Sequence, residues 1–185
     1  MDEKELIEQL RQGDEPAFRW LVNHYRNRVY HAALNLLQNH KDAEDAAQET
    51  FIEVYRSING FREEASLATW INRIATRKAI DKLRRNNTRE KWTQWWGKEN
   101  KEEEVFEHPG VLAENKEKAA ILFTAIQALP EKQRIAFTLI KVQGLSYEEA
   151  CGILQQNIKA VESLIGRART NLQKLLADHY KQRHD

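Results

Sequence analysis

The stretch PEKQRIAFTLIKVQGLSYEEACGILQQNIKAVESLIGRAR, from Pro130 to Arg169, decides the fold of the C-terminal part. Pro130 suits the first turn of a helix, and Gly144 is a residue that commonly ends one. Ser146 and Glu149 have the spacing of a capping box at the start of a short helix. A last helix follows, with apolar residues every three or four positions. The pattern therefore predicts three helices with a tight link before the last, which is typical of a helix-turn-helix.

The last helix is predicted to leave one polar face exposed. Its apolar positions would pack against the two preceding helices, and the opposite face then fits the DNA major groove, which admits a single helix. The residues expected to meet DNA there are Lys159, Ala160, Glu162, Ser163, Arg167 and Arg169. Glu162 opposes phosphate binding unless it accepts a hydrogen bond from a cytosine amino group. The spacing alone is also compatible with a three-helix bundle that binds no DNA and whose charged face is simply solvated.

The N-terminal half also has helical periodicity almost throughout. Asp14 is a suitable N-cap for a helix that runs to about Gln38, and Asp42 can cap a second helix, which ends at Asn59-Gly60. A loop then leads to Ser66, the expected N-cap of a third helix that continues to about residue 85. These segments predict a compact helical bundle.

Charge is distributed unevenly along the 185 residues, although the net charge is only +1. Residues 73–91 carry eight basic and two acidic side chains, and residues 159–183 carry six and two. Between them, residues 99–107 carry five Glu and one Lys. Two basic regions separated by an acidic connector indicate two anion-binding surfaces.

We therefore expect an all-α protein of two small helical domains joined by a flexible linker. The expected domains are residues 1–92 and 116–185, and the expected linker is residues 93–115. Cys151 is the only cysteine, so no intramolecular disulfide can form, and a reducing compartment is favoured.

Several other classes of protein are disfavoured. The N-terminal segment MDEKELIEQL is too charged for a secretory signal, and no apolar run approaches the roughly 20 residues of a membrane span. A cytoplasmic protein without membrane insertion is expected. No phosphate-binding loop, metal-ligand spacing or nucleophile–base pair is apparent, so we expect neither an enzyme nor a cofactor or metal site.

Motifs in both halves resemble the extracytoplasmic-function (ECF) sigma factors of the sigma-70 family. In the C-terminal half, LPEKQR from Leu129, GLSYEEA from Gly144 and the VES and RAR motifs of the last helix resemble region 4. In the N-terminal half, DAEDAAQETF from Asp42 resembles region 2.2, and the segments FR, SLATWI, RIA and DKLRR between Phe61 and residue 85 resemble regions 2.3 and 2.4.

The chain departs from the family pattern in its C-terminal half. Glu162 and Leu164 stand where the family often has basic residues, and Gln155-Gln156 replace the usual glycine of the turn. The departures concern the DNA sequence that is recognised rather than the role of the helix.

The resemblance implies a sigma factor that binds RNA polymerase core and directs transcription initiation at promoters. It implies that the last helix recognises the minus-thirty-five element and that Asp45, Gln48 and Glu49 contact the polymerase core. An acidic helix face suits a basic partner, although without the resemblance the same residues read as an ordinary solvated face. The resemblance also implies an anti-sigma factor as a partner.

The resemblance further implies that the loop from Asn59 to Ser66 captures a base flipped out of the minus-ten element. Such a base needs stacking and hydrogen-bonding groups. The residues expected to contact minus-ten DNA are Phe61, Arg62, Ser66, Asn72, Arg73, Thr76, Arg77 and Lys78. Phe61 is equally suited to anchor the loop in the core. Trp70 resembles a strand-separating position of larger sigma factors, but a core position is favoured.

Two other functions compete with this interpretation. A helix-turn-helix regulator that acts without polymerase would need an effector or dimerisation domain, whereas the first domain carries the polymerase-facing pattern. A mimic that sequesters an anti-sigma factor without binding DNA would lack the basic residues of the 73–91 segment, and these residues are present.

Overall fold

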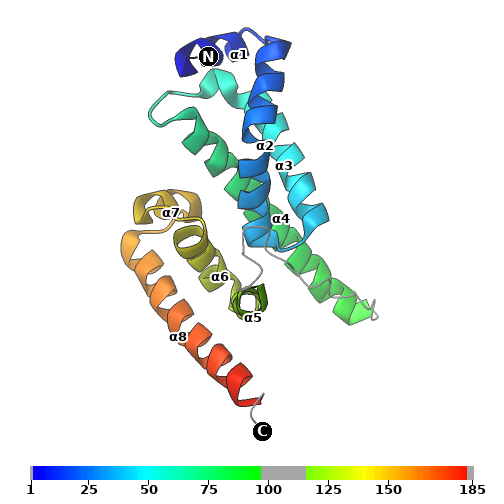
Figure 1. Cartoon of the computed structure of the whole chain (residues 1–185), viewed down its shortest axis with the longest axis vertical. Helices are drawn as coiled ribbons and strands as arrows, with labels where there is room; N and C mark the ends of the chain where they lie inside the picture. The colour runs from blue at the N-terminus through cyan, green and yellow to red at the C-terminus, as the bar shows by residue number, and fades with distance from the viewer. Residues whose placement is uncertain (1, 97–115, 183–185) are drawn as a thin grey trace. The chain divides into compact units, whose positions relative to one another are not determined.

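The computed structural model describes residues 2–96 and 116–182 and divides into two compact units, residues 1–99 (unit 1) and 100–185 (unit 2). All regular secondary structure within the described ranges is helical (Figure 1). The expected all-α fold is therefore confirmed. The greater part of the predicted linker, residues 97–115, lies outside the described residues, and the domain boundaries stay a prediction.

Unit 1 is a bundle built around three long helices (Figure 1). Its elements are α1 (Glu3–Arg11), α2 (Glu15–Leu37), α3 (His40–Ser57), the 3-10 turn η1 (Ile58–Gly60) and α4 (Leu67–Trp96). Helices α2, α3 and α4 pack against one another, and α1 packs on α2 and η1. As predicted, Asp14 caps α2, because its side chain accepts a hydrogen bond from the Ala17 backbone N–H at 2.7 Å.

Two helix boundaries in unit 1 differ from the sequence prediction. Helix α3 begins at His40 because Asn39, and not Asp42, supplies the N-cap. Helix α4 continues to Trp96 rather than ending near residue 85. No Gly or Pro interrupts this segment, and the Asn86 amide donates a 2.7 Å hydrogen bond to the Asp42 carboxylate. This tertiary contact stabilises the helical conformation at Asn86, although Asn has only a weak intrinsic preference for helices.

Unit 2 contains the three helices of the predicted helix-turn-helix, preceded by a helix that the apolar spacing of Ala119, Leu122, Phe123 and Ile126 also predicts. Its elements are α5 (Lys116–Gln127), α6 (Glu131–Phe137), the π-helical turn η3 (Thr138–Val142), α7 (Tyr147–Leu154) and α8 (Ile158–Gln182). The predicted capping box is confirmed, because Ser146 and Glu149 each cap the backbone N–H of the other. The turn between α7 and α8 places Gln155 in the left-handed region, with φ of 53°.

Burial confirms most of the predicted apolar stripe of α8, but Ile158 at its start is 45% exposed. Val161, Ile165, Ala168 and Leu172 are all buried. Helix α8 packs on α5, α6 and α7. Across the α6–α8 contact, the Asn171 side chain donates a 2.8 Å hydrogen bond to the buried Gln133 side chain. Packing thus fixes which face of α8 points outward.

Candidate nucleic-acid interface

The outward face of α8 carries most of the residues that the sequence assigns to the upstream promoter element. The exposed side chains of this set are Lys159, Glu162, Ser163, Arg167 and Arg169, while Ala160 is half-buried. The Asn157 side chain caps the first turn by accepting from the Ala160 backbone N–H at 2.9 Å. The Arg167 guanidinium donates to the Ser163 carbonyl oxygen at 3.3 Å, which directs it along the helix surface. The structure therefore exposes the charged and polar members of the predicted set on α8, with Arg169 on the flank of the helix rather than beside Arg167.

A second group of predicted residues surrounds the loop between η1 and α4, which we call the α3–α4 loop (residues 61–66). Arg62 and Ser66 are exposed, but Phe61 is only 5% exposed and packs on Trp70 with ring centroids 4.9 Å apart. Phe61 was expected either to contact the flipped base or to anchor the loop in the core, and the structure shows that it anchors the loop. The Ser66 hydroxyl accepts from the Thr69 backbone N–H at 3.2 Å and thus caps α4.

The predicted DNA-contacting residues of α4 do not all lie on one face. Arg77 is exposed, whereas Asn72, Arg73 and Lys78 are half-buried. Thr76 is fully buried, because it lies on the helix face that also buries Ile80 and Leu83. Its hydroxyl therefore does not reach solvent, and the DNA contact expected for it is not available in this conformation.

An open pocket of about 430 Å³ lies between α3 and α4, next to Gly60, the residue that precedes the α3–α4 loop. Its lining combines an aromatic ring, an aliphatic side chain and charged groups from α3 and α4: Glu53, Ser57, Gly60, Trp70, Ile74, Arg77, Lys78 and Asp81. Volumes of roughly 300–1,000 Å³ are usual for sites that hold small organic molecules. The pocket therefore offers space, an aromatic surface and hydrogen-bonding groups for a nucleic-acid base.

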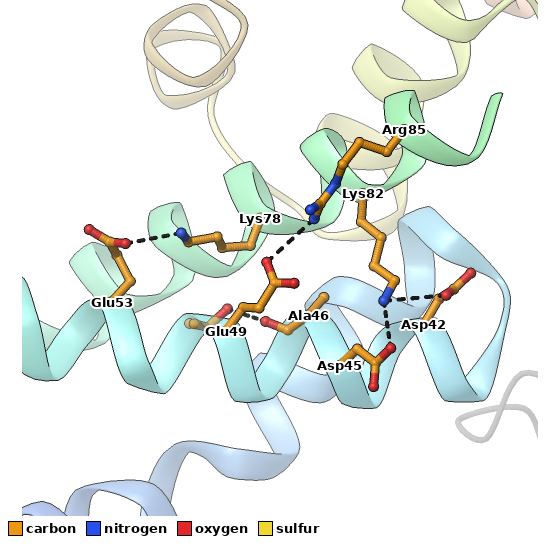
Figure 2. Close-up of polar contacts among 9 residues, drawn as sticks. Asp42, Asp45, Ala46, Glu49, Glu53, Lys78, Lys82 and Arg85 are labelled. Carbon is orange, nitrogen blue, oxygen red and sulfur yellow. Dashed lines mark hydrogen bonds and ion pairs between the residues drawn. The ribbon is translucent and has the colours of Figure 1, made fainter. Parts of the chain in front are cut away.

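Among the side chains that the structure describes, four ion pairs connect α3 with α4, and we call them the charge ladder (Figure 2). The Lys82 ammonium is central, at 2.7 Å from Asp45 Oδ2 and 3.4 Å from Asp42 Oδ1. The other two join Lys78 Nζ to Glu53 Oε2 at 3.0 Å and Arg85 Nη2 to Glu49 Oε2 at 3.4 Å. The ladder therefore joins carboxylates expected to face polymerase with cations of the basic helix.

The centre of the ladder shifts the ionisation of its groups. The hydrogen bond from Lys82, followed by attraction to its charge, lowers the pKa of the Asp45 carboxyl. Partial burial lowers the pKa of Lys82, but the hydrogen bonds and charges of Asp45 and Asp42 outweigh this effect and leave the pKa raised. Both shifts favour the charged pair at neutral pH.

Both units of the chain match known protein families. Residues 21–89 match the family profile "Sigma-70 region 2", and residues 119–172 match "Sigma-70, region 4". The chain is 34% identical to the ECF RNA polymerase sigma-E factor of Haemophilus influenzae, over 91% of this chain and 92% of that protein. It is 32% identical to the RNA polymerase sigma-H factor of Pseudomonas aeruginosa, with 94% and 93% covered.

The chain belongs to the sigma-70 family, in its ECF group. Sigma factors of this kind bind the RNA polymerase core and direct it to promoters through regions 2 and 4, and this is the function of the chain. Unit 1 contains region 2, and unit 2 contains region 4.

Solved structures share the fold of this sigma factor. One is CnrH in complex with the cytosolic domain of CnrY, with a TM-score of 0.62, 24% identity and coverage of 95% of this chain and 97% of that chain. Another is the sigma factor RpoE in complex with the anti-sigma factor NepR from Bartonella quintana, with a TM-score of 0.65, 24% identity and coverage of 86% and 96%.

The outward face of α3 in this sigma factor holds residues that the sequence patterns did not assign to an interface. Ile52 and Tyr55 are 51% and 56% exposed, on the same side of the helix as exposed Gln48. Tyr55 meets Phe18 of α2 edge-on at 5.2 Å. Spacings of four and three residues from Gln48 to Ile52 and Tyr55 are the signal that identifies this stripe.

Residues 2–96 and 116–182 contain no cluster of three or more His, Cys, Asp or Glu side chains arranged for a metal ion. Within the same ranges, every helix is too short or too polar to cross a membrane.

Proposed function

We propose that α8 of this sigma factor recognises the minus-thirty-five element through Lys159, Ala160, Glu162, Ser163, Arg167 and Arg169. The observation that carries the proposal is the division of α8 into a buried apolar face and an exposed polar face. Arg167 and Arg169 supply charge for phosphates or guanine edges, and Ser163 pairs with several bases.

Recognition of the minus-ten element is assigned to the α3–α4 loop and α4. Exposed Arg62 and Arg77 supply charge at this surface, together with half-buried Asn72, Arg73 and Lys78. The flipped base enters the open pocket beside Trp70, while Phe61 holds the loop from below. Stacking on an aromatic ring contributes about 1–3 kcal/mol per base.

Binding of the polymerase core is assigned to α3, through Asp45, Gln48 and Glu49. Gln48 is exposed, and Asp45 and Glu49 keep 49% and 40% of their side chains exposed beside their partners in the ladder. Exposed Ile52 and Tyr55 extend this surface with apolar area. A carboxylate row beside an apolar stripe suits a basic, amphipathic partner helix.

The remaining assignments follow from the family. The chain acts in the cytoplasm, where its polymerase is, and performs no catalysis itself. An anti-sigma factor is its expected regulator, because the solved structures that share its fold include complexes with the cytosolic domain of CnrY and with the anti-sigma factor NepR.

Reconstitution with core polymerase, followed by transcription in vitro, tests the proposal. The Asp45→Ala/Gln48→Ala double variant is expected to bind core at least about tenfold more weakly, which corresponds to about 1.4 kcal/mol. Glu15→Ala, which removes an exposed carboxylate from α2, is the control and should bind core normally. Absence of core binding by the wild-type chain would refute the proposed assignment of α3.

A further inference from the structure

The two ends of the α3–α4 loop are both held by α1, a helix distant in sequence. The Arg11 guanidinium donates a 2.8 Å hydrogen bond to the Phe61 carbonyl oxygen and lies 3.0 Å from a carboxylate oxygen of Glu63. At the other end, the Leu67 backbone N–H donates to a Glu3 carboxylate oxygen at 3.1 Å. One helix therefore contacts both the entrance and the exit of the loop.

Helix α1 is firmly attached to the same core as the loop. Its apolar residues Leu6, Ile7 and Leu10 are buried in one cluster with Phe61 and Leu67. Glu3 and Arg11 are eight residues apart, which is about 12 Å along a helix axis. This length lets a rigid helix reach both ends of the loop at once.

The loop has a conformation that its own sequence does not favour. Glu63 adopts the left-handed region with φ of 59°, which is costly for a residue with a side chain. Its carboxylate is the group that pairs with Arg11. The contact with α1 therefore supports a loop shape that local preference alone would not keep.

We propose that Glu3 and Arg11 are positioning residues for minus-ten recognition, and that α1 is a brace that fixes the shape of the base-capturing loop. The inference rests on the proposed role of this loop. Discrimination between bases needs groups held close to their productive geometry. A loop released from α1 samples other shapes and accepts other bases more readily.

The experiment compares holoenzymes made with the full-length wild-type chain and with Arg11→Ala on a promoter library randomised across the minus-ten element. In the variant, the preference for the best over the worst base at the captured position is expected to fall by about tenfold, or 1.4 kcal/mol. Preferences at the upstream element and core affinity are expected to stay at wild-type values. An unchanged preference at the captured position, or an equal loss at every position, overturns the proposal.

Two further substitutions separate positioning from simple stabilisation. Glu3→Gln keeps an oxygen acceptor for the Leu67 N–H and should retain wild-type selectivity, whereas Glu3→Ala should lose it. Glu63→Gly removes the partner of Arg11 but tolerates positive φ without strain, so selectivity should fall while the melting temperature does not. If instead these variants alter only the melting temperature and leave base preference intact, the brace is merely structural and the proposal is wrong.

The matched control is Arg19→Ala, which removes an exposed cation of α2 that pairs with Glu15. It should behave as wild type in every measurement. Failure of the wild-type chain to bind core polymerase would count against the proposed function. A selective wild type beside an equally selective Arg11→Ala would count only against the brace.

Discussion

The basic residues of the two candidate DNA-binding helices differ in their electrostatic surroundings. In unit 1, Lys78, Lys82 and Arg85 of α4 each lie within 3.4 Å of a carboxylate of α3 (Figure 2). In unit 2, Lys159 and Arg167 of α8 form no ion pair with any residue in the described ranges, and the same holds for Arg169. One surface is partly neutralised within the protein, whereas the other presents its charge to solvent.

The comparison indicates that the two units contribute differently to DNA binding. A phosphate that approaches Arg167 of α8 meets a cation that pairs with no carboxylate in the described ranges, and its binding releases counterions from the DNA. A phosphate that approaches Lys78 must compete with the Glu53 carboxylate. Exposed ion pairs contribute only about 0–1 kcal/mol, so this competition weakens binding without preventing it. Substitutions on the two helices test that contrast.

Loss of Arg167 should have the largest effect, because no acidic residue in the described part of the chain shares its charge. Arg167→Ala is expected to weaken recognition of the upstream element by about 1–3 kcal/mol. Transcription from templates with and without that element measures the effect, and core affinity should not change. Lys174→Ala, two turns further along α8, is the control. Unaltered promoter selection by Arg167→Ala would show that the assigned DNA-binding face is incorrect.

Loss of Lys82 should destabilise unit 1. Its side chain is 13% exposed and serves two carboxylates, so Lys82→Ala leaves Asp42 and Asp45 without their shared cation. We expect a loss of about 1–2 kcal/mol in the free energy of unfolding, between the values for exposed and buried pairs. Urea unfolding measures it. Arg19→Ala, which breaks a pair that is mostly exposed, should cost much less, and an equal cost would contradict the central role of Lys82.

Removal of one carboxylate from the ladder should make α4 behave more like α8. Glu53→Gln frees Lys78 and is expected to strengthen binding of minus-ten DNA by the holoenzyme. It should also steepen the dependence of log K on log salt concentration by up to about 0.9, the value for one added phosphate contact. Glu15→Gln provides a matched neutralisation elsewhere in unit 1. Unchanged salt dependence in Glu53→Gln would mean that the ladder does not compete with DNA.

The smallest effect concerns pH. Because Lys82 lowers the pKa of Asp45 in the folded chain, the pair stabilises unit 1 at neutral pH, and this contribution is lost as pH falls through the lowered pKa. The stability difference between wild type and Asp45→Asn should therefore shrink as the solution is acidified. Chemical unfolding between neutral and acidic pH measures this difference. If the difference in unfolding free energy stays constant with pH, the Asp45–Lys82 pair does not stabilise unit 1 as proposed.

Local signals in the sequence were sufficient for the parts of the fold that depend on neighbouring residues. The capping box at Ser146 and the spacing of Val161 and Ile165 act within one or two turns, and both predictions are confirmed. The extension of α4 was not predictable, because it depends on a contact between Asn86 and Asp42 that only the folded bundle creates.

The candidate sites show the same limit. The exposure of Arg167 followed from the apolar stripe of α8, but the burial of Thr76 depends on how α4 is rotated against its neighbours. The charge ladder depends on the register between α3 and α4, which no motif encodes. The contacts of Glu3 and Arg11 span 64 and 50 residues of sequence and were likewise not apparent.

The left-handed residue between α7 and α8 has a practical consequence for engineering. Gln155 adopts φ of 53°, a conformation that glycine adopts without steric cost. The strain at this residue therefore lowers the thermal stability of the protein. Relief of the strain contributes about 1–2 kcal/mol, and the greater freedom of glycine in the unfolded chain offsets about 0.5–1 kcal/mol of it. Gln155→Gly should thus give a modestly more thermotolerant regulator, measurable by calorimetry, whose DNA-facing side chains are untouched.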